Sequence, residues 1–302
     1  MRWRWPALVL LAALASAACA PAPAGTPDAA DLDAGRSLYR RYCATCHGDE
    51  GRGDGPSAGG LATRPSDFTD GRRLNRVPDE FLRNVILDGG PAEGLSPAMP
   101  PFRAFLDDRD VARLVAYLRS LAQPPFTAAM AAPAVTVPGA PRQPIFFSHL
   151  VHAGAYQIPC LYCHSDARRS DYAGLPSVER CLGCHRVIGA QDNPEIQKIH
   201  DYARRGEPIP WVRVFKVPEY VKFPHEPHVR AGLACQTCHG PVERMRVVGA
   251  RTGRTLANDL LHLIGLRVPP PPLTMGWCIE CHRAENAARG TQAPLDCLAC
   301  HH

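Results

Sequence analysis

The sequence has little of the apolar material that a chain of 302 residues usually buries. Aromatic residues make up only 7% of it, while proline and glycine number 31 and 25. Such a composition disfavours a large core built from side chains alone and favours turns and loops. Beyond the N-terminus, the sequence also lacks any apolar run of the roughly 20 residues that a membrane-spanning helix needs. We therefore do not expect a chain with spanning helices.

The one notable apolar run stands at the N-terminus. Two arginines within the first four residues precede apolar residues from Ala7 to about Ala18. The run is too short to span a bilayer and ends in small residues, which is typical of a signal peptide. We expect residues 1–19 to direct export, so that the mature protein lies on the periplasmic side of a bacterial cytoplasmic membrane.

Cys19 stands where a bacterial lipoprotein carries its lipidated cysteine. The Ala- and Pro-rich residues 20–31 would then form the tether. Ser16 departs from the leucine that is usual in such signals, and ordinary cleavage after Ala17 or Ala20 is the alternative. We favour lipidation, which would hold the protein on the membrane surface without a spanning helix.

The other 12 of the 13 cysteines follow a single pattern of Cys-x-x-Cys pairs, each followed directly by histidine. This is the c-type haem attachment motif, in which two thiols bond to the haem and the adjacent histidine binds the iron. Zinc sites do not need a histidine after every pair, a redox dithiol would occur once, and disulfides have no use for the histidine. The six motifs are Cys43 and Cys46 with His47, Cys160 and Cys163 with His164, Cys181 and Cys184 with His185, Cys235 and Cys238 with His239, Cys278 and Cys281 with His282, and Cys297 and Cys300 with His301.

Six haem c groups would also supply the apolar surface that the side chains lack. Their propionate carboxylates are not counted in the formal net charge of +5. The basic balance is therefore no argument for an anionic partner, and we expect no binding to nucleic acid.

Residues 32–122 are predicted to form one domain. It opens with a helical pattern over residues 33–42, which leads into the first motif, and closes with an amphipathic helix over residues 107–121 whose N-cap is Asp107. A loop containing Met99-Pro lies between them. This order resembles the class I monohaem cytochromes c, and the resemblance implies that Met99 is the distal ligand of the first haem iron.

The rest of the chain divides into a linker and a second domain. Residues 123–144 are rich in alanine and proline, which is typical of a semi-rigid linker. Residues 145–302 hold five motifs and look internally duplicated. Each half begins with Phe-x-His-x-x-His, at His149/His152 and at His225/His228, and continues with two motifs, and the last motif is an addition.

The sixth ligand of each iron decides between carrying electrons and binding substrates. We expect His149, His152, His225 and His228 to be distal ligands, each to a different iron. One iron of the second domain then remains, and Met245 is our choice for it. Its rivals are Met275, His200 and His262, while His302, beside a motif histidine, is expected to stay unattached. If none of them binds, that haem is open.

Five segments are spread over most of the second domain, namely residues 158–165, 173–178, 208–213, 216–221 and 273–283. These segments are similar to the pentahaem cytochrome subunit of bacterial alternative complex III. That complex also has a separate monohaem class I cytochrome, often a lipoprotein, so the chain resembles a fusion of the two. Related subunits occur in quinone reductase complexes. Two features depart from that family. The stretch 247–272 looks long for it. The expected anchor lies at the N-terminus, before the monohaem domain, whereas pentahaem subunits of the family are commonly anchored to the membrane beside their own haems.

The resemblance implies a mainly α fold with much irregular loop. It also implies a class I cytochrome c domain followed by a multihaem, class III-like domain that is organised around its haems. It also implies partners: an iron–sulfur, molybdopterin-type subunit and membrane quinol-binding subunits. We expect an electron-transfer subunit without catalytic residues, which passes electrons from the pentahaem to the monohaem domain and on to an oxidase or soluble cytochrome c.

Two alternatives remain. A multihaem oxidoreductase of the nitrite or hydroxylamine type would need an open iron, and usually lysine in place of a motif histidine, whereas all six motifs keep histidine. A carrier for a different quinone reductase is the other.

Overall fold

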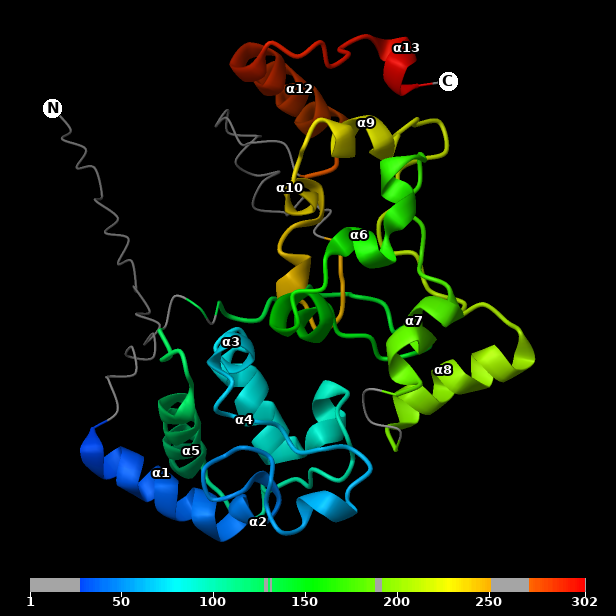
Figure 1. The fold of residues 1–302 in the computed structure, drawn as a ribbon. Coiled ribbons are helices and arrows are strands. Elements are labelled where there is room, and N and C mark those ends of the chain that lie inside the picture. Colours follow the sequence, from blue (N-terminus) through cyan, green and yellow to red (C-terminus); the bar gives the residue numbers. More distant parts are fainter. Residues whose placement is uncertain (1–27, 128–129, 131, 188–191, 251–271, 302) are drawn as a thin grey trace, which may run out of the picture.

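The computed structural model describes residues 28–127, 130, 132–187, 192–250 and 272–301, which form helices and loops without a strand in those ranges (Figure 1). The predicted mainly helical fold is confirmed. The N-terminal helices gather at one end of the molecule, and the later helices extend away from them as far as the C-terminus. In the described ranges no helix has the length and apolar character needed to cross a membrane.

The two long helices of the N-terminal domain, α1 and α5, begin where aspartate side chains cap them. The Asp28 carboxylate accepts the N–H of Asp31 at 2.7 Å, and the Asp107 carboxylate accepts the N–H of Asp110 at 2.8 Å. The cap at Asp28 starts the first helix earlier than the residue 33 expected from sequence. The elements are α1 (Ala29–Tyr42), α2 (Ala44–His47), η1 (Ala58–Gly60), α3 (Gly71–Leu74), α4 (Asp79–Asp88), η2 (Gly90–Glu93) and α5 (Asp108–Leu121).

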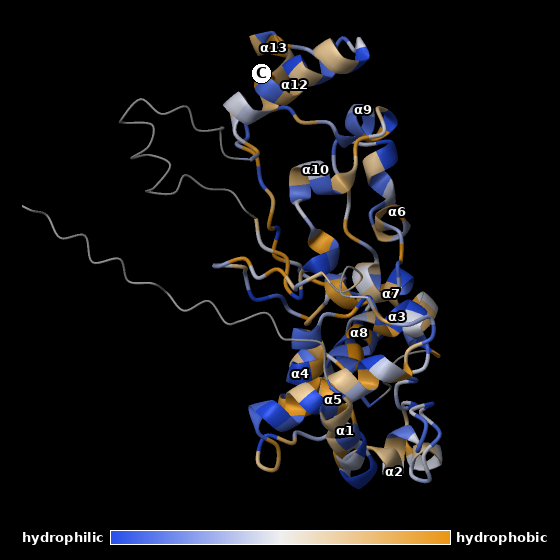
Figure 2. Cartoon of the chain, turned by 90° about the vertical axis from the view of Figure 1, so that its left-hand side faces the viewer, coloured by the Kyte–Doolittle hydropathy of each residue, from blue (hydrophilic) through white to orange (hydrophobic). Residues whose placement is uncertain are grey.

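Helices α1 and α5 cross in close contact and enclose the main core. Tyr39 of α1 is completely buried, as are Val111 and Leu114 of α5 with 1% exposure each. A Cβ atom added to Gly35 would lie 2.3 Å from the Arg113 carbonyl oxygen, so glycine lets the two backbones approach. Figure 2 shows the apolar residues of α4 and α5 gathered in this part of the molecule.

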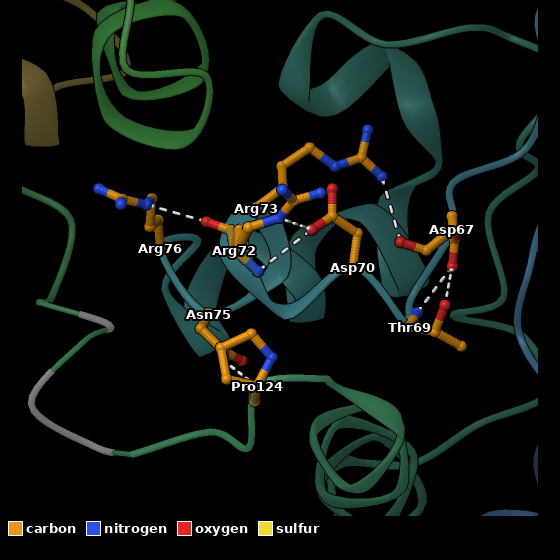
Figure 3. Close-up of polar contacts among 8 residues, drawn as sticks. All are labelled: Asp67, Thr69, Asp70, Arg72, Arg73, Asn75, Arg76 and Pro124. Carbon is orange, nitrogen blue, oxygen red and sulfur yellow. Dashed lines mark hydrogen bonds and ion pairs between the residues drawn. The ribbon is translucent and has the colours of Figure 1, made fainter.

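The end of the N-terminal domain is tied back onto α3. The Asn75 side chain donates to the Pro124 carbonyl at 2.8 Å (Figure 3). The N–H of Gly71 donates to the Gln123 carbonyl at 2.9 Å. Farther along the predicted linker, the N–H of Val135 donates to the Arg244 carbonyl at 2.8 Å. The described parts of the linker are therefore bonded to both domains.

Most of the C-terminal elements are short, apart from α8 and α12, and several bury nothing. Helices α6, α9, α10, α12 and α13 contain no buried residue, while a small apolar cluster joins α7 and α8. Protein side chains alone thus give this domain little core. The elements are η3 (Leu150–Ala155), α6 (Cys160–Cys163), η4 (Ser165–Arg168), α7 (Val178–His185), α8 (Pro194–Arg205), α9 (His225–Arg230), α10 (Cys235–His239), η5 (Val242–Arg244), α12 (Met275–Arg289) and α13 (Cys297–Cys300).

Candidate haem sites

All six motifs lie on or at the end of a helical turn. Residues three positions apart share one side of a helix, so each turn presents its two thiols to the same side, and the motif histidine lies within the helix or directly after it. None of the twelve described cysteines forms a disulfide. The turns that carry the motifs are α2, α6, α7, α10, α12 and α13.

The two thiols of the first motif, those of Cys43 and Cys46, lie at the start and within the turn of α2. The N–H groups of Cys46 and His47 both donate to the Cys43 carbonyl, at 3.2 and 2.9 Å, which closes the turn. Both cysteines are half-buried and free of disulfides. Burial, and then the neighbouring Cys46 thiol, raises the pKa of Cys43 to about 12. Attachment of a haem through Cys43 and Cys46 stays a prediction.

The histidine of the first motif is half-buried and lies against an aromatic ring. The His47 ring stacks on Phe68 with centroids 4.6 Å apart, and its Nδ1 lies 3.1 Å from the Ser66 carbonyl oxygen. A hydrogen bond from Nδ1 leaves Nε2 for a metal. Burial lowers the pKa of His47, which favours the neutral, metal-binding form.

Met99 lies in a tightly folded loop after α4. The N–H of Gly90 donates to the Met99 carbonyl at 2.9 Å, and the N–H of Met99 donates to the Ser96 carbonyl at 3.2 Å. A Cβ atom on Gly90 would lie 2.1 Å from the Ser96 oxygen, so glycine is required at that crossing. Binding of Met99 to iron stays a prediction.

The two Phe-x-His-x-x-His segments each bring their histidines to motif histidines. A metal–nitrogen bond is about 2 Å long, so two imidazole rings on one metal ion have centroids roughly 6 Å apart. Four ring pairs in the structure fit this spacing. They are His149–His164 at 6.5 Å, His152–His185 at 6.0 Å, His225–His239 at 6.2 Å and His228–His282 at 6.0 Å.

The pairs repeat the sequence duplication. In each half the first histidine faces the first following motif and the second histidine faces the next one. The His149–His164 planes differ by 3° and the His225–His239 planes by 2°. Phe147 stacks on His152 and Phe223 lies against His228, at centroid distances of 4.3 and 4.6 Å.

Backbone carbonyls orient most of these rings. The Nδ1 atoms of His152, His164, His225, His228 and His282 lie 2.6 to 2.9 Å from carbonyl oxygens. Such bonds leave each Nε2 for iron. No sequence signal could have located the partners, because every residue has a carbonyl group.

Burial keeps two of the rings neutral. It lowers the pKa of His149 to about 4, with help from the neighbouring His164 and His152. It lowers the pKa of His239 to about 4 as well, with help from His225 and His164. Both rings are therefore in the form that binds metal at neutral pH.

The sixth motif has a different surrounding. The His301 ring packs on Tyr220 with centroids 5.8 Å apart, and its Nδ1 lies 3.3 Å from the Tyr220 carbonyl oxygen. Within the described ranges no histidine ring faces it in the manner of the four pairs. The distal side of this motif is therefore not assigned by ring geometry.

Met245, our choice for that iron, lies elsewhere. Its side chain is fully buried, and its carbonyl accepts the N–H of Leu150 at 2.9 Å. The turn at η5 folds onto η3 in the middle of the molecule, whereas α13 lies at the far end (Figure 1). The structure thus does not bring Met245 to His301.

The rival residues divide in three ways. His200 uses its Nε2 toward the His185 carbonyl oxygen at 3.3 Å, so that nitrogen is engaged. Met275 opens α12 and is 65% exposed. His262 and His302 lie outside the described residues, as do Cys19 and the predicted signal peptide.

The motif thiols of the C-terminal domain show which motifs are neighbours. Burial and then the thiols of Cys281 and Cys278 raise the pKa of Cys238 to about 11. A thiol that shifts the pKa of another cysteine lies close to it, so these shifts identify neighbouring motifs. They place the motifs in the spatial order third, second, fourth, fifth and sixth, which differs from their order in the sequence. The links are Cys163 with Cys184, Cys160 with Cys235, Cys238 with Cys281, and Cys278 with Cys300.

These donor sets fit haem c. Paired thiols followed by histidine, opposite histidines at the spacing of a shared metal ion, and helices that bury nothing by themselves all suit a covalently attached ring. When bound, such groups supply reversible one-electron chemistry.

Comparison with known proteins agrees with this chemistry. Residues 30–118 match the family "Cytochrome C oxidase, cbb3-type, subunit III", and residues 221–302 match "Cytochrome c7 and related cytochrome c". The chain is therefore a multihaem cytochrome c with a class I domain and a c7-type domain, as the sequence predicted.

A solved structure, the Kuenenia stuttgartiensis reducing HAO-like protein complex, is 25% identical over 46% of this chain and 68% of that chain, with a TM-score of 0.31. The multihaem cytochrome c subunit of menaquinone reductase from Nitratidesulfovibrio vulgaris is 30% identical over 167 residues, 53% of this chain and 77% of that protein. At this identity and coverage, the chain belongs to the same family of multihaem electron-transfer cytochrome c subunits.

Proposed function

We propose that this chain is a hexahaem electron-transfer subunit of a quinone-linked respiratory complex, of the alternative complex III or menaquinone reductase type. The four histidine pairs carry the proposal, because two nitrogen ligands leave an iron without a place for substrate. The similarity to a menaquinone reductase subunit supports the quinone-linked context.

Within that function, Met99 and the four paired histidines are the proposed distal ligands. The bounds 32–122, 123–144 and 145–302 are the proposed monohaem domain, linker and pentahaem domain. The proposed partners are an iron–sulfur, molybdopterin-type subunit and membrane quinol-binding subunits, with an oxidase or soluble cytochrome c at the other end.

The direction of transfer is proposed from ligand chemistry. Methionine–histidine ligation raises a haem potential relative to histidine–histidine ligation, so electrons should move from the C-terminal domain toward the Met99 domain. A potentiometric titration of the purified holoprotein checks this. A Met99-dependent haem with the highest potential agrees with the proposal, and one below all the others reverses the direction.

The reverse direction is the second candidate, because the similar protein is a menaquinone reductase, whose name implies delivery of electrons to a quinone. Purification of the complex from its native host, followed by assays with menaquinol and with menaquinone, distinguishes the two. Failure of both activities would contradict the quinone-linked proposal. EPR before and after addition of nitrite or cyanide tests the remaining enzymatic alternative through a high-spin haem that binds either ligand.

Lipidation of Cys19 is proposed as the anchor on the periplasmic face. Mass spectrometry of the mature N-terminus checks it: a diacylglyceryl-modified Cys19 is expected, whereas an unmodified N-terminus near residue 18 or 21 would contradict it.

A further inference from the structure

The loop that carries Met99 is bonded to the C-terminal domain as well as to its own. Three polar side chains reach it from residues far away in sequence, namely Asp192, Asn193 and Arg246. We call these three residues the loop clamp. They were not among the residues that the sequence singled out.

Asn193 makes the most direct contact. Its Nδ2 donates to the carbonyl oxygens of Gly94 and Leu95, at 2.7 and 3.1 Å, while its Oδ1 accepts the N–H of Glu195 and caps α8. The side chain is almost completely buried, with 2% exposure. Its amide is thus divided between starting α8 and holding the loop.

Asp192 adds two contacts from the adjacent position. Its two carboxylate oxygens accept the hydroxyls of Ser96 and Thr63, at 2.7 and 3.1 Å. The Ser96 hydroxyl also accepts the N–H of Ala98 at 3.1 Å, and the Ser96 carbonyl accepts the N–H of Met99. One residue therefore links the clamp to the backbone of Met99.

Arg246 holds the other end of the loop. Its Nε lies 2.5 Å from Oε2 of Glu93, whose side chain is fully buried, and its Nη2 donates to the Ala92 carbonyl. Asn84 donates to the other Glu93 oxygen at 2.8 Å. Arg246 therefore contacts the start of the loop at two points, Glu93 and Ala92.

We propose that the loop clamp of the C-terminal domain positions Met99 for iron binding in the N-terminal domain. Asp192, Asn193 and Arg246 are positioning residues in this proposal, which rests on the proposed Met99 ligation. The distal methionine of one domain is then held by the surface of the other, and the two domains are locked together at the ligand loop.

The clamp also connects the loop, through α8, to the helix of one motif. Asn193 begins α8, which packs on α7, the helix of the third motif. The partner of the third motif histidine, His152, lies on η3, from which Leu150 and Val151 enter the core of the N-terminal domain. Near the third motif, α8 is therefore bonded to the Met99 loop, and η3 packs on the core of the N-terminal domain.

The test uses the full-length holoprotein with the substitution Asn193→Asp. Aspartate keeps the acceptor that caps α8 but has no N–H to donate to Gly94 and Leu95. We expect loss of part of the red-region absorption band of methionine-ligated ferric haem. We also expect added imidazole to displace Met99 roughly tenfold to a hundredfold more readily, in line with losses at groups that support metal ligands.

Arg246→Ala provides a second test with a matched control. Arg244→Ala, two residues away, removes hydrogen bonds to the Pro133 carbonyl in the linker and does not touch the loop. We expect Arg246→Ala to weaken the methionine band and Arg244→Ala to leave it unchanged. Low-spin histidine–histidine signals that match the wild type show that a variant is folded.

Met99→Ala separates the two levels of the proposal. If the wild-type band survives in Met99→Ala, the Met99 ligation fails, and the clamp proposal fails with it. If Met99→Ala removes the band but Asn193→Asp and Arg246→Ala keep the wild-type band and imidazole affinity, only the clamp proposal is overturned. Neither readout needs a partner or quinone.

Discussion

At the scale of single residues, the molecule is organised by which nitrogen of each imidazole is engaged. Histidines whose Nδ1 contacts a carbonyl keep Nε2 for iron, as in His164 and His228. His200 does the opposite and directs Nε2 to a carbonyl oxygen. The same residue type therefore divides into proposed ligands and a structural histidine.

Substitution of a single proposed distal histidine tests the ligand assignment. We expect His149→Ala to convert one low-spin haem to a high-spin form, because His164 would lose its opposite ligand while the thioether bonds remain. EPR of the ferric holoprotein measures the change. His200→Ala is the control, and a spin change in His200→Ala with none in His149→Ala would contradict the assignment.

Glu93 gives a pH dependence whose sign follows from its surroundings. Burial raises the pKa of Glu93, and this effect is larger than the opposite effects of the Asn84 hydrogen bond and the Arg246 charge, which lower it. Folding then favours the protonated carboxyl, so this contribution to stability is full below the ordinary glutamate pKa and is lost as the pH rises through the raised value. Comparison of unfolding free energies of wild type and Glu93→Gln from acid to neutral pH checks it. The free energy of unfolding of Glu93→Gln should increase relative to that of the wild type as the pH rises. The opposite trend would contradict the prediction.

At the scale of elements, the closest packing is that of α1 against α5. Gly35→Ala should destabilise the N-terminal domain by about 1–3 kcal/mol, since the new methyl group would meet the Arg113 carbonyl. Chemical denaturation of the holoprotein measures the loss. Gly60→Ala, with nothing within 4 Å, is the control. Equal losses of stability in Gly35→Ala and Gly60→Ala would show that the close approach of α1 and α5 at Gly35 is not what makes alanine unfavourable there.

The elements also show how far sequence reasoning reaches. The motif turns, the helix capped by Asp107 and the duplicated histidine segments follow from local spacing, so they could be read directly from sequence. The spatial order of the motifs could not, because the contact of Cys160 with Cys235 joins residues 75 positions apart through tertiary folding. The same holds for Asn193, which looks like an ordinary helix cap in sequence but also bonds the Met99 loop.

Met245 stays a prediction as a distal ligand. The chain turns at η5 back onto η3, and the Met245 side chain is fully buried there. The short turn η5 sets the direction of the chain there, and no hydrophobic periodicity in the sequence predicts it.

At the scale of the whole molecule, the two ends differ in what holds them together. The N-terminal end has a continuous core of buried side chains, whereas helices α10, α12 and α13 bury no residue. Bound haem rings would supply the missing apolar contacts of the C-terminal end. The stability of that end should therefore depend on haem attachment more than that of the N-terminal end.

Protein produced without haem attachment tests this difference. In limited proteolysis, we expect the first cuts in the C-terminal domain beyond residue 220, followed later by cuts in residues 28–122, because the latter retain the contacts of Tyr39, Val111 and Leu114. The holoprotein, treated in parallel, should resist in both regions. Mass spectrometry of the fragments locates the cuts. Early cleavage within α1 or α5, with the C-terminal helices intact, would show that side-chain packing rather than haem stabilises the C-terminal end.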